Sequence, residues 1–317
     1  MLNQIFSGKE NELRSFFLLA SILGIIFVLS FVFGLKVRRD DVSNPTQIVY
    51  QAFPEVSLQA KAVYIYDVRT KAILYAKNEN TRYPLASLTK VMSALVALES
   101  SPSYSSISID PEALRAEGDT GLLAREKWRL KDILDFSLIT SSNDGMRAVA
   151  LSLGALSNSQ ASDDEIVEDF VRSMNAKALE LDLKNTYFWN ETGLDESDNK
   201  SGAYGTARDV TSLLEYVLTY HPDLLQATRE SSAVIKSLDN RSHIATNTNE
   251  IADDIPGLLA SKTGWTDQAG GNLAFAFDPE LGRPIIITIL GSTLEGRFED
   301  ARALISATLE FINSNQD

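Results

Sequence analysis

Three short motifs, far apart in the chain, constrain its fold more than any other feature. They are Ser87–Lys90 (Ser-Leu-Thr-Lys), Ser141–Asn143 (Ser-Ser-Asn) and Lys262–Gly264 (Lys-Thr-Gly). Each alone is a common pattern, but agreement of all three in this order is improbable by chance. Together they supply a serine nucleophile, a lysine one helical turn away, a second hydroxyl with an amide, and a second lysine. Such a set performs acyl transfer without histidine, provided that the fold brings the three segments to one site.

The first motif opens the segment Ser87–Glu99, which is apolar nearly all round and is therefore predicted to be a buried helix. A serine at a helix N-terminus lies beside free backbone N–H groups and the positive end of the helix dipole. Lys90 lies on the same face as Ser87, and burial lowers the pKa of a lysine. We predict that neutral Lys90 takes the proton from Ser87. The alternative is a helix cap followed by an unrelated surface lysine.

The second motif follows the end of a predicted helix. Ser141 is predicted to relay a proton to the leaving group, and Asn143 to hold a peptide carbonyl of the substrate. The alternative is that the polar run Thr140–Asp144 simply caps the next helix.

The third motif is predicted to lie just before a strand or to begin one. Lys262 offers a fixed positive charge, Thr263 can bond a carboxylate, and Gly264 lets a substrate approach the backbone closely. The backbone N–H of Trp265 is predicted to be an oxyanion donor beside that of Ser87. The alternative is a turn with a solvated lysine.

Hydrophobic periodicity predicts an α/β (α+β) fold. Strands at both ends of the chain, with a helical block between them, indicate one domain with a mainly antiparallel sheet flanked by helices and an all-helical insertion at about 100–220. Ala62–Asp67 and Ala72–Ala76 are predicted to form a hairpin. Further helices are predicted at Leu130–Ile139, Gly145–Leu153, Glu165–Leu181, Ala207–Tyr220 and Phe298–Ile312, and further strands at Asn272–Phe277 and Pro284–Leu290.

An uncharged apolar run, Phe16–Leu35, is long enough to span a bilayer core of about 30 Å as a helix. A signal peptide has a shorter apolar region and a small-residue cleavage site, which we do not find after this run. We therefore predict an uncleaved transmembrane anchor rather than a buried core helix. The expected division is a cytoplasmic tail (1–15), the anchor (16–36), a polar linker (37–59) and a catalytic domain (60–317).

Composition excludes several other chemistries. The chain has no cysteine, which rules out disulfides and thiolate metal sites, and its two histidines have no metal-ligand spacing. The net charge is −14 and no basic stripe is present, which argues against a nucleic-acid partner. We expect no metal and no cofactor.

From Ala62 to Phe311 the chain resembles the low-molecular-weight penicillin-binding proteins, the serine-type D-alanyl-D-alanine carboxypeptidases of peptidase family S11. Beyond the three motifs, the similarity is carried by stretches that favour carboxypeptidases over β-lactamases. These stretches are Tyr83–Met92, Leu183–Phe188, Thr192–Asp195, Ala207–Asp209 and Lys262–Asp267. The resemblance implies a β-lactamase/transpeptidase-like fold, with the site in a cleft between the sheet and a helical subdomain.

The same resemblance implies the reaction. Ser87 would be acylated by the D-Ala-D-Ala end of a peptidoglycan stem peptide, with Lys90 as its base. Ser141, Asn143 and Lys262 would shuttle protons and bind substrate, and water would release the shortened peptide. β-Lactam antibiotics would be covalent inhibitors.

The implied substrate places the catalytic domain on the extracytoplasmic face of the cell membrane, as a single-pass protein. The flanking charges argue mildly the other way. Lys9 and Arg14 precede the apolar run, whereas Lys36, Arg38 and Arg39 follow it, and positive charge favours the cytoplasmic side.

Three residues depart from the family pattern. Gly145 stands where an alanine is usual, Ala260 where a glycine often precedes the Lys-Thr-Gly strand, and Trp265 differs in shape from the usual neighbour. We expect these departures to affect rate and substrate preference more than the reaction itself.

Three other functions remain alternatives. A β-lactamase would need a Glu-x-x-Leu-Asn segment for deacylation, and the nearest approach, Glu180–Asn185, is one residue too long. A D,D-endopeptidase or transpeptidase would share the acyl-enzyme step, so the motifs do not separate it from a carboxypeptidase. A non-catalytic wall-binding or sensor protein would not need the reactive side chains that are present here.

Overall fold

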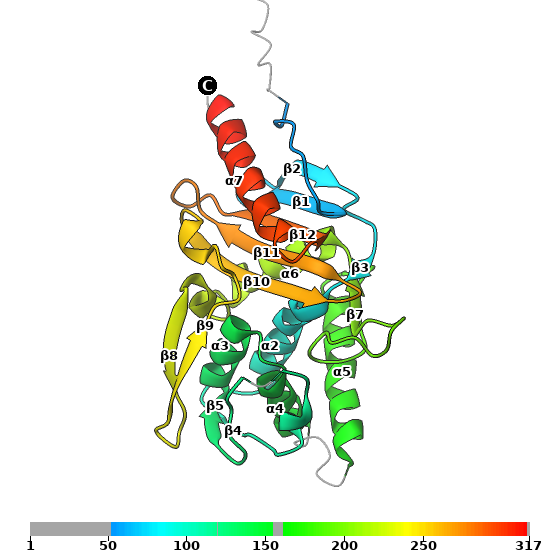
Figure 1. The fold of residues 1–317 in the computed structure, drawn as a ribbon, viewed down its shortest axis with the longest axis vertical. Coiled ribbons are helices and arrows are strands. Elements are labelled where there is room, and N and C mark those ends of the chain that lie inside the picture. The colour runs from blue at the N-terminus through cyan, green and yellow to red at the C-terminus, as the bar shows by residue number, and fades with distance from the viewer. Residues whose placement is uncertain (1–51, 119, 155–160, 316–317) are drawn as a thin grey trace, which may run out of the picture. The chain divides into compact units, whose positions relative to one another are not determined.

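A five-stranded antiparallel sheet forms the centre of the computed structural model, which describes residues 52–118, 120–154 and 161–315 (Figure 1). The strand order is β10-β11-β12-β1-β2, so the hairpin near the start of the described chain pairs with strands near its end. Ala62 lies opposite Leu290 across the β1–β12 pair. The predicted hairpin and antiparallel sheet are confirmed. The strands are β1 (Ala62–Asp67), β2 (Ala72–Lys77), β10 (Leu258–Thr266), β11 (Gly270–Phe277) and β12 (Ile285–Ser292).

Helices cover both faces of this sheet, because its strands send apolar side chains alternately to either side. On β1, Val63 and Ile65 join a core with α7 (Gly296–Ser314). Ala62 and Tyr64 join the larger core, to which α6 (Ala207–Tyr220) and the other helices contribute. Burial on both faces explains why β12 reads as a continuous apolar run rather than an alternating one.

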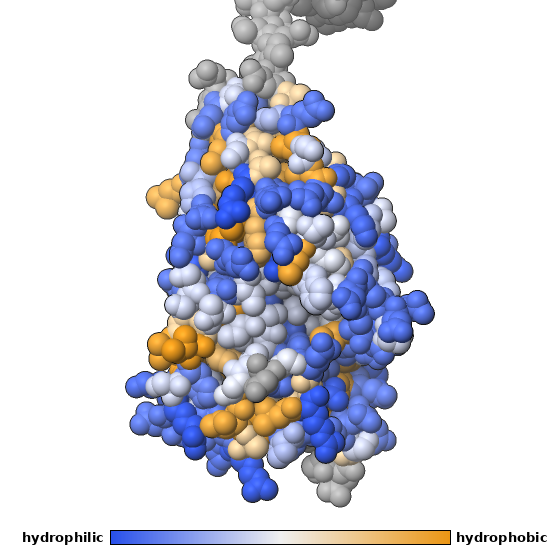
Figure 2. All heavy atoms as spheres, in the orientation of Figure 1, coloured by the Kyte–Doolittle hydropathy of each residue, from blue (hydrophilic) through white to orange (hydrophobic). Residues whose placement is uncertain are grey.

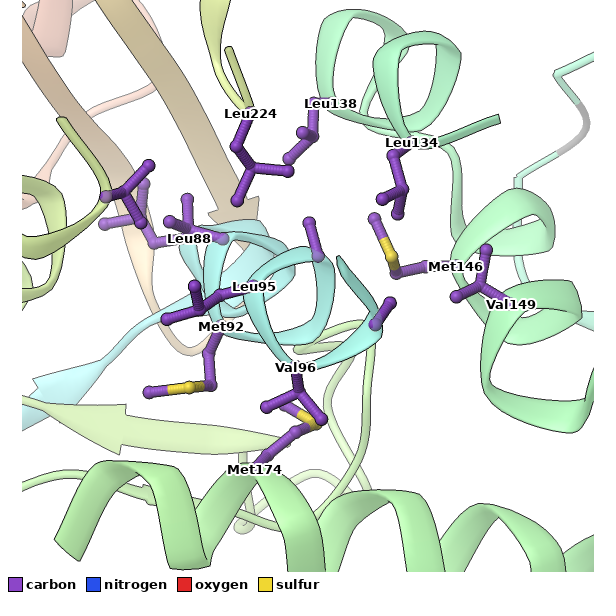
Figure 3. Packing of buried hydrophobic residues seen from close by; sticks show 14 of the residues in the cluster. Leu88, Met92, Leu95, Val96, Leu134, Leu138, Met146, Val149, Met174 and Leu224 are labelled. Carbon is purple, nitrogen blue, oxygen red and sulfur yellow. The ribbon is translucent and has the colours of Figure 1, made fainter. Parts of the chain in front are cut away.

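The second part of the domain is a group of helices packed around α2 (Thr89–Ser100). Figure 3 shows Leu88, Met92, Leu95 and Val96 in the middle of this core, with side chains from the surrounding helices turned toward them. The predicted buried helix is therefore confirmed, and it lies along the boundary between the sheet and the helices. The surrounding helices are α3 (Leu130–Thr140), α4 (Asn143–Gly154) and α5 (Asp163–Glu180).

The prediction of an all-helical insertion is wrong. Short strands occur within residues 100–220, one more strand precedes this range, and a further hairpin follows it. These strands are two to five residues long, too short to give a clear period-2 pattern in the sequence. They are β4 (Ser106–Ser108) with β5 (Lys127–Arg129), β3 (Tyr83–Pro84) with β7 (Ala203–Gly205) and β6 (Tyr187–Phe188), and β8 (Ser232–Lys236) with β9 (Ser242–Thr246). Single 3₁₀ turns lie at η1 (Ala86–Leu88), η2 (Ala113–Arg115), η3 (Gln226–Arg229) and η4 (Ala252–Asp254).

The predicted anchor, the tail before it and most of the linker lie outside the described residues. Among the residues that are described, no helix is long and apolar enough to cross a membrane. The described part of the linker has no helix or strand, but it contacts the domain. The ring of Phe53 lies 5.1 Å from that of Tyr75 and 5.6 Å from that of Phe311.

The face shown in Figure 2 is largely hydrophilic, with apolar side chains gathered in separate small areas. Exposed apolar residues include Val234 and Ile244, which lie opposite each other on the β8–β9 hairpin. Scattered apolar groups of this kind are normal on a protein surface.

Candidate active site

Ser87 lies in the 3₁₀ turn η1, directly before α2, so the α-helix begins two residues later than predicted. The residue before it, Ala86, has a φ of 48°, a conformation that non-glycine residues rarely adopt. Gly193 packs against this turn so closely that a Cβ there would lie 1.9 Å from the Ala86 carbonyl oxygen. The surrounding chain therefore holds Ala86 in a strained conformation, as is common at functional sites, and this fixes where Ser87 begins the helix.

Lys90 joins the nucleophile to the second motif. Its Nζ lies 2.8 Å from Ser87 Oγ, 2.6 Å from Asn143 Oδ1 and 2.9 Å from the Thr192 carbonyl oxygen. Burial lowers the pKa of Lys90 to about 7, against an opposing effect of Glu191. A lysine with this pKa is neutral in a large share of molecules at neutral pH, as a general base must be.

Two residues of the second motif, Ser141 and Asn143, contact the site, and the third, Ser142, caps the next helix. Ser141 ends α3 with a φ of 61° and accepts a hydrogen bond from Lys262 Nζ at 2.9 Å. Ser142 caps α4, since its Oγ accepts from the Gly145 N–H at 3.0 Å. Asn143 Nδ2 donates to the Glu117 carbonyl at 2.6 Å. Because that amide nitrogen has two hydrogens, one is left to donate to a substrate carbonyl.

The third motif lies inside β10 rather than before a strand. Lys262 is 1% exposed, and its pKa is held well below the usual range by burial, then by the positive charges of Lys90 and Arg297. Its Nζ also donates to the Thr263 carbonyl at 2.8 Å. The Thr263 hydroxyl lies 2.6 Å from that of Thr248, so it is held at a fixed position beside the lysine.

Gly264 allows β10 to touch the nucleophile turn. A Cβ at this position would lie 2.9 Å from the Leu85 carbonyl oxygen and 3.1 Å from the Ser87 nitrogen. The glycine is therefore required by the protein's own packing, and not only by the approach of substrate that the sequence suggested. Trp265 follows it and is 49% exposed. It still belongs to β10, where it pairs with Gly271, and its backbone N–H directly follows the close contact between Gly264 and the Ser87 turn.

Residues that the sequence analysis missed complete the site. Asn272 on β11 donates to the Pro84 and Leu85 carbonyls at 2.9 and 3.1 Å, which ties the sheet to the nucleophile turn. Arg297 on α7 is 6% exposed and donates to the Gly264 carbonyl at 3.0 Å. Neither residue belongs to a local motif, so no signal in the sequence pointed to it.

A cleft of ≈ 620 Å³ opens beside these groups and includes Asn143 and Trp265 in its wall. It is large enough to hold the end of a peptide. Its other lining residues are polar or acidic apart from Gly118 and Leu194. They are Glu117, Asp195, Ser197, Asp198, Thr266, Asp267 and Gln268.

Two features singled out in the sequence, Gly145 and Glu180, have structural explanations. At Gly145 a Cβ would lie 2.1 Å from Ser137 Oγ, so the alanine usual there would require Ser137 to move. Glu180, the candidate for a lactamase-type glutamate, ends α5 with an exposed side chain that pairs with Lys177 at 2.8 Å. It therefore forms part of the surface of α5.

Comparison with known proteins relates these features to a family. The sequence profile of peptidase S11, D-alanyl-D-alanine carboxypeptidase, matches residues 47–293. The D-alanyl-D-alanine carboxypeptidase DacF of Bacillus subtilis is 29% identical over 269 residues, 83% of this chain and 64% of that protein. A D-alanyl-D-alanine endopeptidase of Pseudomonas aeruginosa is 29% identical over 220 residues, 67% of this chain and 65% of that protein. The chain spans just under two thirds of the length of each relative.

Penicillin-binding protein D2 of Listeria monocytogenes, solved in an ampicillin-bound form, has a similar structure. It is 27% identical, with a TM-score of 0.66 over 80% of this chain and 98% of that one. The similarity confirms the expected α/β fold of antiparallel sheet and helices.

Proposed function

The chain belongs to the peptidase S11 family of serine-type D-alanyl-D-alanine carboxypeptidases, and on that premise we propose that it removes the terminal D-alanine from peptidoglycan stem peptides. The observation that carries the proposal is the contact between Lys90 and Ser87. Lys90 Nζ lies 2.8 Å from Ser87 Oγ, and burial brings the pKa of Lys90 to about 7. A base and a nucleophile are thus within hydrogen-bond reach at neutral pH.

Acylation follows from this geometry. Neutral Lys90 takes the proton from Ser87, and Oγ attacks the carbonyl carbon of the penultimate D-alanine. The oxyanion that forms is stabilised by the backbone N–H groups of Ser87 and Trp265. When the peptide bond breaks, the proton taken by Lys90 passes to the departing D-alanine nitrogen through Ser141, whose hydroxyl accepts a hydrogen bond from Lys262 at 2.9 Å. Water then attacks the acyl carbon and gives a proton to Lys90. Lys90 returns this proton to Ser87 Oγ as the ester bond breaks and the shortened peptide leaves.

Recognition of the D-alanine carboxylate is the role proposed for the β10 side of the cleft. Lys262 and the Thr263 hydroxyl lie on this strand, and Arg297 adds a positive charge against Gly264. A carboxylate that binds here favours the protonated form of Lys262, because an anion beside a buried lysine offsets the burial and the cations that lower its pKa.

The location of the enzyme is also part of the proposal. The uncharged run Phe16–Leu35 supports a single-pass membrane anchor, and a cell-wall substrate supports an extracytoplasmic catalytic domain. Protease treatment of intact and permeabilised cells tests the orientation: the domain is expected to be digested in intact cells.

Cleavage of D,D-crosslinks is a second candidate activity, favoured by the similarity to the P. aeruginosa endopeptidase. Purified protein given a stem pentapeptide and a crosslinked dimer separates the two. We expect release of free D-alanine from the pentapeptide, and none with Ser87→Ala. Cleavage of the dimer alone would replace carboxypeptidase activity with endopeptidase activity. Equal D-alanine release by the wild type and by Ser87→Ala would overturn the acyl-enzyme account.

A further inference from the structure

A buried carboxylate, Glu191, lies directly behind the catalytic groups and has no part in the chemistry described so far. It is 1% exposed. It precedes Thr192, whose carbonyl oxygen accepts from Lys90 Nζ at 2.9 Å. Sequence reasoning gave this residue no role, since a lone glutamate in a loop carries no pattern.

The backbone of this loop is fastened to α2 at two points. The Glu191 carbonyl accepts from Ser93 Oγ at 2.6 Å, and the Thr192 carbonyl accepts from Lys90. Ser93 and Lys90 are three residues apart and share one face of the helix. The Glu191 carboxylate is therefore held in a fixed position relative to the Lys90 ammonium.

The side chain of Glu191 is only partly satisfied. Its Oε1 lies 3.4 Å from an Arg147 nitrogen, while its Oε2 is buried without a hydrogen-bond partner among the described residues. The other guanidinium nitrogen of Arg147 lies 4.0 Å from Asp164, whose side chain is 91% exposed. A buried carboxylate with one long ion pair is costly unless another cation shares its charge.

Lys90 is that other cation. The charged groups around Glu191 come from several elements. Arg147 lies on α4, Lys90 on α2, and Glu196 in the same loop as Glu191. Glu112 and Arg115 line the same cavity of ≈ 260 Å³. Glu191 raises the pKa of Lys90 and burial lowers it. On the opposite side Lys262 is buried too, and the positive charge of Lys90 lowers its pKa.

We propose that Glu191 is a positioning residue that acts through Lys90: its buried carboxylate, anchored by Arg147, sets how readily Lys90 takes the proton of Ser87 and gives it back. The inference rests on the proposed function, because it assumes that Lys90 is the base. The carboxylate stabilises the ammonium that forms during acylation. Without that charge Lys90 is neutral down to a lower pH, and it is also a weaker base.

The test is the pH profile of acylation by a fluorescent penicillin, measured as a second-order rate constant from pH 5 to 9. The acid limb of this profile reports the pKa of Lys90 in the free enzyme. For Glu191→Gln we expect its midpoint to fall by roughly half a pH unit or more. The variant is then as fast as wild type or faster below the wild-type midpoint, and slower above it. A purely structural defect would lower the rate equally at every pH.

The matched control is Glu112→Gln, which removes a carboxylate from the same cavity but leaves the Glu191 loop intact. It is expected to keep the wild-type midpoint, and Glu191→Asp, which keeps the charge, is expected to lie closer to wild type than Glu191→Gln. If Glu191→Gln does not fold, the double variant Glu191→Gln/Arg147→Met serves instead, because it removes both members of the ion pair. Its midpoint is also expected to fall, since Glu191 is the neighbour whose charge raises the pKa of Lys90.

An unchanged or raised midpoint in folded Glu191→Gln, or in the double variant where it replaces Glu191→Gln, overturns the inference. Failure of the wild type to be acylated at all is a different result, since it removes the proposed function itself.

Discussion

The two buried lysines of the site, one on each side of the cleft, differ in the charges around them. Lys90, on α2, has the carboxylate of Glu191 behind it, and its pKa lies at about 7. Lys262, on β10, is surrounded by the positive charges of Lys90 and Arg297. Both side chains are almost fully buried, so burial alone does not distinguish them. The neighbouring charges thus differ in sign: a carboxylate favours the protonated form of Lys90, whereas two cations disfavour the protonated form of Lys262 until an anion binds beside it.

Replacing Lys90 with arginine is expected to have the largest effect on the acylation rate. A guanidinium cannot be deprotonated in a protein, so Lys90→Arg keeps the positive charge but loses the base. We expect the rate of penicillin acylation to fall by about 10²- to 10⁴-fold, the usual contribution of a general base. Stopped-flow fluorescence measures it, and a loss under about tenfold would show that the proton goes elsewhere.

The same substitution on the sheet side has a smaller expected effect. Lys262→Arg keeps a cation near the substrate carboxylate, so we expect kcat/KM for the pentapeptide to fall by about tenfold. Lys262→Ala removes the charged contact, and we expect its kcat/KM to fall by about 100-fold. The measurement is steady-state D-alanine release. If Lys262→Arg is as poor as Lys262→Ala, then Lys262 also acts by transferring a proton, and the contrast with Lys90 disappears.

The smallest expected effect concerns the contact between the two sides. Gly264→Ala places a Cβ 2.9 Å from the Leu85 carbonyl oxygen, so β10 must move away from the nucleophile turn by a few tenths of an ångström. We expect acylation to slow by about tenfold, since a misplacement of 1 Å costs about 100-fold. Ala260→Gly on the same strand is the control: it lowers stability by about 0.5–1 kcal/mol and leaves acylation nearly unchanged. Equal acylation rates in the two variants would contradict this role of Gly264.

Much of the fold was predictable because long elements carry strong periodic signals. The apolar helix from Ser87 onward, the early hairpin and the late strands appear close to their predicted positions. The strands of β4 to β7 were missed, because two or three residues contain no period to detect.

The site was predictable where chemistry depends on side chains in short motifs, and not where it depends on the fold. Lys90, Asn143 and Ser87 come together as the motifs suggested. The contact of the Thr192 carbonyl with Lys90 could not be predicted from the sequence, because every residue has a backbone carbonyl. Arg297 joins the site only because α7 packs against the sheet, which lets its guanidinium reach the Gly264 carbonyl.

The central claim is that Ser87 forms the acyl-enzyme with Lys90 as its base, and mass spectrometry of the intact, penicillin-treated protein tests it most directly. We predict that the wild type gains the mass of one penicillin molecule, attached at Ser87. Ser87→Ala is predicted to gain none, and Lys90→Ala to gain it far more slowly. An unmodified wild type, or an adduct of the same mass on Ser87→Ala, would contradict the account.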